Sequence, residues 1–406
     1  MSAFGLLRPP ATILFGEGAA SELGALAAVY GVRVLVVTDS WLAASAHGAV
    51  VIESLHAAGL HIDVLDSVVA ELPLATVEAA VEDARALRPD CIVGFGGGSS
   101  LDMAKLVAAG LAHDGPLREL YGDDKLRGAT LPIIAVPTTA GTGSEVTPVA
   151  VLGDPELDLK IGISSARLIP RAAVCDPLLT HGAPPRVTAY AGADALAHAI
   201  EAYTAIRYSN WEAGRGRMFV GKNALSDRFA LHAIRKISGS LLAAMRDEPE
   251  ARAAMSEAAL CAGLAFATAG TALAHALQYP IGARTATPHG LGVGLLLPHV
   301  MRFNLPVRET ELADVGEALG VAADGAAAAD AVQNLVRAAG IPSTLAELGI
   351  DRDELDHMAD LALRVERLVL NNPRPADKQD LIDIMTSAYG ETAGEPAPAG
   401  TGSVAL

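Results

Sequence analysis

The chain has 406 residues, of which 51% are hydrophobic, 19% charged and 4% aromatic. This length predicts two domains or one large enzyme domain, and the composition excludes a disordered, collagen-like or disulfide-stapled protein. Because 30 Lys and Arg residues face 47 Asp and Glu residues, the formal charge is −17. That charge disfavours binding to nucleic acid or an anionic membrane and favours a small-molecule partner.

Cysteine usage favours the reducing cytoplasm. Cys91, Cys175 and Cys261 lie far apart and form no CxxC or Cys/His pattern, so neither a disulfide framework nor a thiolate zinc site is expected. The sequence has no apolar run of about 18 residues. It also lacks the charge and cleavage pattern of a signal peptide, so we expect no membrane segment.

Residues 1–180 alternate β-branched runs with helical stretches, which predicts parallel strands joined by crossover helices. Each expected strand ends in a polar or glycine-rich loop, and ligands bind at the carboxyl edge of such a sheet. This part is therefore predicted to be an α/β domain. Strands are expected over residues 32–39, 61–65, 90–95 and 131–136, and helices over 41–58 and 76–87.

Residues 181–390 are rich in alanine, leucine and histidine at helical spacing, which predicts an all-helical second domain. Within it, residues 207–227 are polar and have no clear period, so we expect a loop inserted between helices. The tail over 391–406 is rich in Pro, Gly and Ala and is predicted to be disordered.

A glycine triplet, Gly96 to Gly98, follows the third expected strand and precedes a helical stretch. Three glycines allow backbone amides to approach an anion at the helix N-terminus, where a diphosphate would fit. The alternative is a tight turn that needs glycine only for its dihedral angles. The segment does not match GxGxxG, so it is not an ordinary Rossmann fingerprint.

Two further features lie at strand ends. Asp39 follows the first expected strand, where a carboxylate can accept from ribose hydroxyls and repel a 2′-phosphate, favouring NAD over NADP. Its alternative role is to cap the next helix. Residues 137–145 combine hydroxyls with glycine amides and would cradle a polar ligand, or simply form a turn rich in Ser and Thr.

Asp194 and His198 are four residues apart, so on a helix they lie on one face and can bind one cation. His275 and His289 could complete a four-ligand set. Each histidine taken alone is more often an ordinary core or surface residue. Nitrogen and oxygen ligands suit Fe(II) or Zn(II) and do not distinguish between them.

Four motifs in this order resemble the iron-containing (group III) alcohol dehydrogenase family: GGGSSLDMAK, PTTAGTGSE, DALAHAIEAY and HALQYPIGARTATPHG. The resemblance runs from about residue 8 to 390. It implies a Rossmann-like dinucleotide-binding domain with a parallel sheet, followed by an all-helical metal-binding domain. It also implies a homodimer or larger homo-oligomer.

Carried over residue by residue, the resemblance implies catalysis through a metal held by Asp194, His198, His275 and His289. It places a diphosphate at Gly97, Gly98 and Ser99, and the adenosine ribose at Asp39. The other residues expected to line the cofactor cleft are Asp102, Thr138, Thr139, Thr142 and Lys160. A solvated lysine on an edge strand is the alternative for Lys160.

The chain departs from the family pattern at two places. Tyr279 replaces a histidine of lactaldehyde reductases that is a candidate for proton relay, so Tyr279 becomes a candidate substrate or proton-relay contact. Where the family usually has Pro-Asn-Pro, this chain has Pro73, Leu74 and Ala75, so an Asn near the adenosine is missing.

The resemblance implies an NAD-dependent dehydrogenase that interconverts a primary alcohol and its aldehyde, with the metal as a Lewis acid. One alternative is a hydroxyacid-oxoacid transhydrogenase or a 4-hydroxybutyrate-type dehydrogenase, with Arg215, Arg217 and Lys222 binding a substrate carboxylate. A dehydroquinate-synthase-like lyase, a zinc glycerol dehydrogenase and a non-catalytic scaffold are further alternatives.

Overall fold

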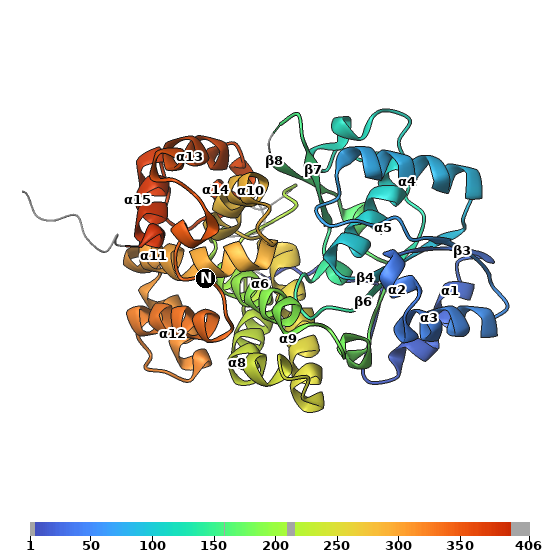
Figure 1. Cartoon of the computed structure of the whole chain (residues 1–406), viewed down its shortest axis with the longest axis horizontal. Helices are drawn as coiled ribbons and strands as arrows, with labels where there is room; N and C mark the ends of the chain where they lie inside the picture. The colour runs from blue at the N-terminus through green and yellow to red at the C-terminus, as the bar shows by residue number, and fades with distance from the viewer. Residues whose placement is uncertain (1–4, 158, 209–215, 391–406) are drawn as a thin grey trace, which may run out of the picture.

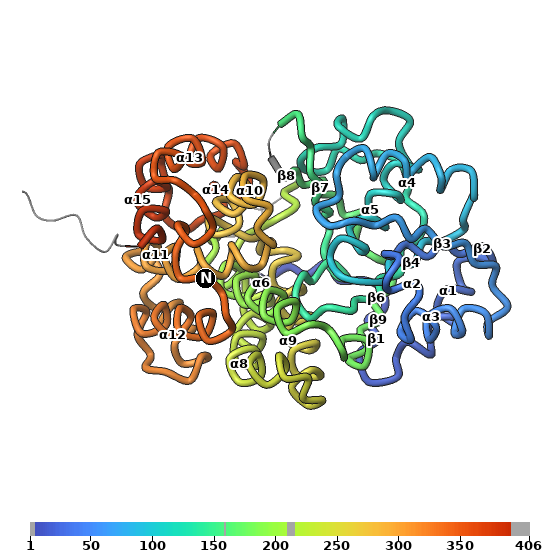
Figure 2. The backbone as a smooth tube through the Cα atoms, viewed as in Figure 1, coloured from blue at the N-terminus to red at the C-terminus, as the bar shows by residue number. Residues whose placement is uncertain are grey.

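The computed structural model describes residues 5–157, 159–208 and 216–390, which form an α/β domain beside a helical domain (Figure 1). From Pro185 onward the backbone stays in the helical half (Figure 2). The expected division after residue 180 remains a prediction; in the structure that position lies between β9 (Ala172–Cys175) and α6 (Pro185–Thr204). The tail over 391–406 and Arg215 lie outside the described residues.

The first domain is built on a six-stranded sheet in which every pair of neighbouring strands is parallel, in the order β1-β9-β6-β4-β2-β3. The predicted α/β class is therefore confirmed, and all four expected strands are present as β2, β3, β4 and β6. The sequence did not reveal β1 or β9. The strands are β1 (Thr12–Phe15), β2 (Arg33–Val37), β3 (His61–Leu65), β4 (Cys91–Gly96), β6 (Ile133–Pro137) and β9 (Ala172–Cys175).

Helices cover both faces of this sheet. Val34 and Val36 of β2 join the apolar cluster of α1 and α3, whereas Leu35 and Val37 join that of α4 and α5. Burial on both faces explains why residues 34–37 of β2 form an unbroken apolar run. The helices are α1 (Leu23–Ala28), α2 (Ser40–Ala43), α3 (Ala46–Ala57), α4 (Leu74–Leu87) and α5 (Gly98–Leu111).

The single helix expected over 41–58 is wrong, because Ser45 divides it into α2 and α3. The Ser45 hydroxyl accepts a hydrogen bond from the Gly48 amide at 3.0 Å and donates to the Leu42 carbonyl at 2.7 Å. Serine is a preferred residue at a helix N-cap, and it starts α3 here.

The sheet order places the candidate loops at one crevice. Strand β2 pairs with β3 on one side and β4 on the other, so the crossovers after β2 and β3 run in opposite directions. Ligands of open α/β sheets bind at such a switch point. The loops after β2, β4 and β6, which carry Asp39, the glycine triplet and residues 137–145, all leave from this edge.

A second sheet, which was not predicted, lines the cleft. Its order is β5-β8-β7, with β5 parallel and β7 antiparallel to β8. The edge-strand alternative for Lys160 is therefore wrong, because Lys160 lies in the central strand and is buried. The strands are β5 (Gly122–Asp123), β7 (Val149–Asp154) and β8 (Leu159–Ser164).

The second domain is helical, as predicted, and its core surrounds α6. Its longest helix, α11, bends at Arg308, whose guanidinium donates to the carbonyls of Thr204 (2.9 Å) and Ala205 (3.1 Å) at the end of α6. The helices are α6 (Pro185–Thr204), α8 (Ser226–Ala244), α9 (Pro249–Ala269), α10 (Leu273–Thr285), α11 (His289–Leu319), α12 (Gly325–Ala338), α13 (Leu355–Leu363), α14 (Glu366–Asn371) and α15 (Lys378–Tyr389).

The described part of the inserted segment is tied to the N-terminal arm of the chain. The Leu6 amide donates to Asn223 Oδ1 at 3.1 Å, and Arg8 donates to the Met218 carbonyl at 2.8 Å. Within the described ranges no single helix is long and apolar enough to cross a membrane, although α9 and α10 pass that test as a pair bent by 102°.

Candidate active site

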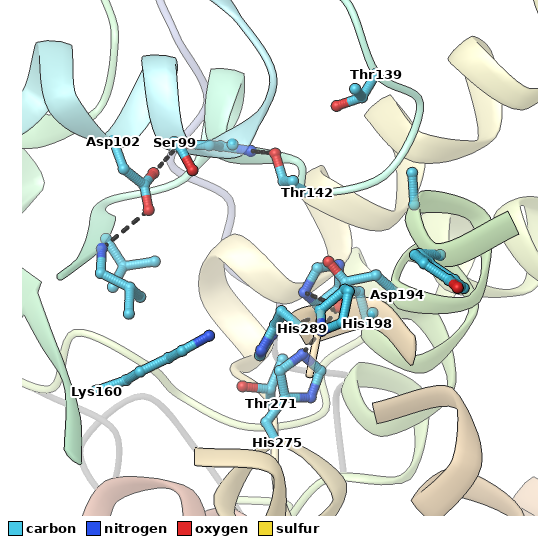
Figure 3. Close-up of a pocket in the computed structure, with 18 of the residues that line it drawn as sticks. Ser99, Asp102, Thr139, Thr142, Lys160, Asp194, His198, Thr271, His275 and His289 are labelled. Carbon is cyan, nitrogen blue, oxygen red and sulfur yellow. Dashed lines mark hydrogen bonds and ion pairs between the residues drawn. The ribbon is translucent and has the colours of Figure 1, made fainter. Parts of the chain in front are cut away.

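A cavity of about 820 Å³ opens between the two domains. Figure 3 shows Ser99, Asp102 and Thr142 on one side of it and the histidine cluster on the other. The α/β domain thus contributes glycine and hydroxyl groups, whereas the helical domain contributes the imidazoles.

The helical side brings together all four predicted metal ligands. Helix α6 carries Asp194 and His198, α10 carries His275 in its first turn, and α11 begins with His289. The Nε2 atoms of His198, His275 and His289 lie 3.6, 3.6 and 3.7 Å from the same oxygen, Asp194 Oδ1.

These atoms fit a divalent cation. Asp194 Oδ1 and His275 Nε2 are buried and have no hydrogen-bond partner among the described residues. A buried carboxylate oxygen without a partner is costly, and a cation between it and the three nitrogens would remove that cost. A set of one oxygen and three nitrogen ligands suits Fe(II) and Zn(II).

Glu201 orients the third ligand and was not predicted as a site residue. Its carboxylate accepts from His275 Nδ1 at 2.6 Å and from the amides of Ala272 and Ala274 at 2.8 and 2.7 Å. The bond to Nδ1 turns Nε2 of His275 toward Asp194, as carboxylates commonly do behind metal-bound histidines. The spacing from Asp194 to Glu201 is seven residues, a helical repeat that could have identified it.

The surroundings set different protonation states for the three imidazoles. Burial lowers the pKa of His198 to about 4 and that of His289 to about 3, against the attraction of Asp194. Burial also acts to lower the pKa of His275, but the Glu201 and Asp194 carboxylates outweigh it and raise that pKa to about 9. His198 and His289 are therefore neutral at pH 7, the form that binds a metal.

The cofactor side of the cavity contains most of the predicted residues. Gly97 is the N-cap of α5, and a Cβ at Gly98 would lie 2.7 Å from Thr142 Cγ2, so the two loops touch. Gly97, Thr138 and Asp39 do not line the cavity. The predicted residues that do line it are Gly98, Ser99, Asp102, Thr139, Thr142 and Lys160.

Two of the predicted carboxylates hold loops in place. Asp39 Oδ1 accepts from the Leu42 amide at 2.9 Å and so caps α2. Asp102 accepts from the Ser144 hydroxyl at 2.6 Å and the Val151 amide at 2.9 Å, which fixes the loop after β6 against α5. Burial raises the pKa of Asp102.

Lys160 and Tyr279 both face the cavity. Lys160 pairs with Glu71 and extends toward the histidine cluster (Figure 3). The ring of Tyr279 lies 6.2 Å from that of His289, and burial raises the pKa of its phenol.

The described basic residues of the inserted loop do not reach the cavity. The alternative to carboxylate binding, a solvated surface loop, is wrong for Lys222, which is buried, pairs with Asp227 at 2.8 Å and lies over the Tyr203 ring. Arg217 is exposed and lies over the Tyr208 ring. Instead, the loop contributes Phe219 to the cavity, a residue that its sequence gave no reason to select.

Comparison with known proteins identifies the family. The family model described as Iron-containing alcohol dehydrogenase matches residues 10–177, and the model of the C-terminal part of the Fe-containing alcohol dehydrogenase family matches residues 188–389. Long-chain-alcohol dehydrogenase 1 of Geobacillus thermodenitrificans is 36% identical, with 98% of this chain and 99% of the relative covered.

Two further similarities extend this result. The NAD-dependent methanol dehydrogenase of Bacillus methanolicus is 31% identical, with 94% of this chain and 98% of the relative covered. A crystal structure of 1,3-propanediol oxidoreductase has a TM-score of 0.87 and 32% identity, with 95% of this chain and 100% of that chain covered.

Proposed function

Because the chain belongs to the iron-containing alcohol dehydrogenase family and is therefore an oxidoreductase acting on CH–OH groups, we propose that it transfers hydride between a small primary alcohol and NAD. In the oxidative direction the alcohol becomes an aldehyde, hydride passes to NAD⁺ to give NADH, and one proton is released. The reverse direction is aldehyde reduction.

The observation that carries this proposal is the convergence of three imidazole nitrogens on one buried oxygen at the wall of the cleft. In the proposed enzyme, Fe(II) would be held by Asp194, His198, His275 and His289, and the same ligands would accept Zn(II). When bound, the metal supplies a Lewis acid for the substrate oxygen, and the nicotinamide supplies the redox chemistry.

The residues of the chain orient these groups and exclude water. Glu201 holds His275 in position, and Phe266 stacks on His198 with 4.0 Å between ring centres. The amides at the start of α5, at Gly98 and Ser99, are suited to a diphosphate. The carboxylate of Asp39, at the neighbouring strand end, is the group that would meet the adenosine ribose. The hydroxyls of Thr139 and Thr142 offer further polar contacts in the cleft.

The same proposal includes the cytoplasm as location and a homo-oligomer as assembly. Cys91, Cys175 and Cys261 are free thiols, which supports a reducing compartment. Strand β1 is a half-exposed edge of the large sheet, and Phe15 is 39% exposed there, which supports pairing with a second copy.

The test is NADH formation from a panel of short primary alcohols, diols and hydroxyacids after anaerobic loading with Fe(II). Metal-dependent NADH release is expected from the loaded protein, and none from a chelator-treated sample or from His275→Ala. His232→Ala is the matched control, because His232 pairs with Glu257 outside the cleft. Absence of NADH with every alcohol would contradict the proposal.

A further inference from the structure

Arg367 brings a cationic side chain to the cleft from α14, and the proposed function gives it no role. It lines the cavity together with Phe219, Thr271 and Tyr279. Helix α14 packs against α10, which carries His275 and Tyr279. Arg367 therefore reaches the cavity from a helix that packs against the helix of His275 and Tyr279.

An aromatic ring supports this guanidinium. The Arg367 side chain lies over the ring of Phe219, 4.6 Å from its centre. Phe219 is in turn held by its neighbours, because the Val220 amide donates to the Thr268 carbonyl at 2.7 Å and Arg8 donates to the Met218 carbonyl. Stacking on a fixed ring restricts the guanidinium and leaves its N–H groups pointing outward at the ring edge.

The N–H groups of Arg367 have no hydrogen-bond acceptor among the residues that the structure describes. Its ionic partner there is Asp123, at 3.8 Å from Nε, beyond hydrogen-bond distance. Asp123 is exposed on β5, and an exposed ion pair of this length contributes little. Two other cationic residues line the cavity. Lys160 is paired with Glu71, and Arg186 is exposed in the first turn of α6.

The charge of Arg367 reaches the groups beside the metal ligands. It opposes the burial that raises the pKa of Tyr279, and the Tyr279 ring is a neighbour of His289. Arg367 lines the same cavity as His275 and His289, so a substrate with its hydroxyl carbon at the histidine cluster can extend its other end toward Arg367. The fork of an arginine matches a carboxylate through two parallel hydrogen bonds.

We propose that Arg367 is a specificity-determining residue that binds the carboxylate of a primary alcohol or aldehyde, so that the preferred substrates are ω-hydroxy acids and their semialdehydes. This inference rests on the proposed dehydrogenase function and adds the substrate class. The substrate carboxylate would then be bound by Arg367 of α14, stacked on Phe219 of the inserted loop, and not by Arg217 or Lys222.

The experiment compares 4-hydroxybutyrate with 1,4-butanediol, which has the same chain length but no charge, on the Fe(II)-loaded enzyme with NAD⁺. The ratio of their kcat/KM values should favour the hydroxyacid in the wild type. In Arg367→Gln that ratio should fall about 10- to 100-fold, mainly through KM of the hydroxyacid. Arg367→Lys should recover part of it.

Arg217→Gln is the matched control, because Arg217 also lies over an aromatic ring but is not among the residues that line the cavity. It should leave the ratio unchanged. An equal kcat/KM for the two alcohols in the wild type would overturn the inference while leaving the dehydrogenase function intact. An unchanged ratio in Arg367→Gln would also overturn it. Turnover of neither alcohol would instead refute the proposed function, and the inference with it.

Discussion

Glu201 is the residue on which the geometry of the metal ligands depends most. The Glu201 carboxylate orients His275 and also accepts hydrogen bonds from two amides at the start of α10. We expect Glu201→Gln to lower the affinity for Fe(II) about 10- to 100-fold, because an amide holds the imidazole less strongly than a carboxylate does. Competition with a chelator of known affinity measures this.

Glu257→Gln provides the control for that substitution. Glu257 accepts from His232 at 2.8 Å, so it is also a carboxylate paired with a histidine, but on the outer side of α8 and α9. The Glu257→Gln variant should bind Fe(II) with the affinity of the wild type. If the two variants had equal affinities, Glu201 would have no specific effect on the metal.

Glu145 should make stability depend on pH. Burial raises the pKa of Glu145 to about 7, against its ordinary 4.5, in spite of the nearby charge of Lys105. The folded state therefore keeps a proton that the unfolded state releases, so the contribution of Glu145 is full below pH 4.5 and is lost as the pH rises through 7. Burial lowers the pKa of Lys105 from 10.5 to about 8. The contribution of Lys105 to stability is therefore lost as the pH falls through 8, and this loss lies largely above the pH range over which Glu145 acts.

We expect this effect of Glu145 to be about 1–3 kcal/mol between pH 5 and pH 8. Urea unfolding of the metal-free wild type and of Glu145→Gln at both pH values measures it. Relative to the wild type, the variant should be more stable at pH 8 than at pH 5, because only the wild type has a buried carboxyl that must ionise. A difference that is the same at both pH values would contradict the assignment.

At the scale of elements, the loop after β6 fits tightly between the domains. Gly143 has φ 61°, and a Cβ there would lie 2.6 Å from Gly263 Cα in α9. We expect Gly143→Ala to destabilise the protein by about 1–3 kcal/mol, because strain and close backbone contact combine. It should also weaken NADH binding by displacing Thr142. Urea unfolding and a fluorescence titration with NADH measure the two effects.

Gly239→Ala is the matched control for that loop. Gly239 lies inside α8, and a Cβ there would meet no atom within 4 Å. Alanine favours a helix over glycine, so this variant should be more stable by about 0.5–1 kcal/mol and should bind NADH normally. Equal effects of the two substitutions would show that the loop after β6 has no special constraint.

Which strands could be predicted follows from their length and their β-branched content. Strands β2, β4 and β6 are runs of five or six residues that are mostly apolar, and β3 has the β-branched pattern HIDVL. Strands β1 and β9 have only four residues each, and β9 is half alanine, so their patterns are weak. The break at Ser45 was missed because a capping serine inside an otherwise helical pattern resembles an ordinary helix residue.

The site could be predicted in part for a similar reason. Asp194 and His198 share one helix, so their spacing alone indicates a shared face. His275 and His289 were only candidates to complete the set, and the resemblance to a family assigned them. Phe219 and Arg367 are far apart in the sequence and meet only through packing of the helical domain, so no local pattern indicates their contact.

For the molecule as a whole, the bound metal should stabilise the folded helical domain, because its proposed ligands come from three helices, α6, α10 and α11. A ligand present at about 100 times its Kd stabilises the folded state by about 2.7 kcal/mol. For a domain of this size we expect chelation to lower Tm by about 5–10 °C. Calorimetry with and without Fe(II) measures this, and a Tm independent of metal in the wild type would contradict it.

The helices that carry three of the four ligands are also joined by residues that do not line the cavity. Arg308 of α11 closes the end of α6 by donating to Thr204 and Ala205, and the Tyr203 hydroxyl donates to Asp314 at 2.6 Å. These contacts hold the end of α6 at the bend of α11 and just beyond it. For protein engineering, we expect substitutions at Arg308 or Asp314 to shift the two helices, and so to alter the ligand spacing and the choice of metal, while the residues that line the cavity stay the same.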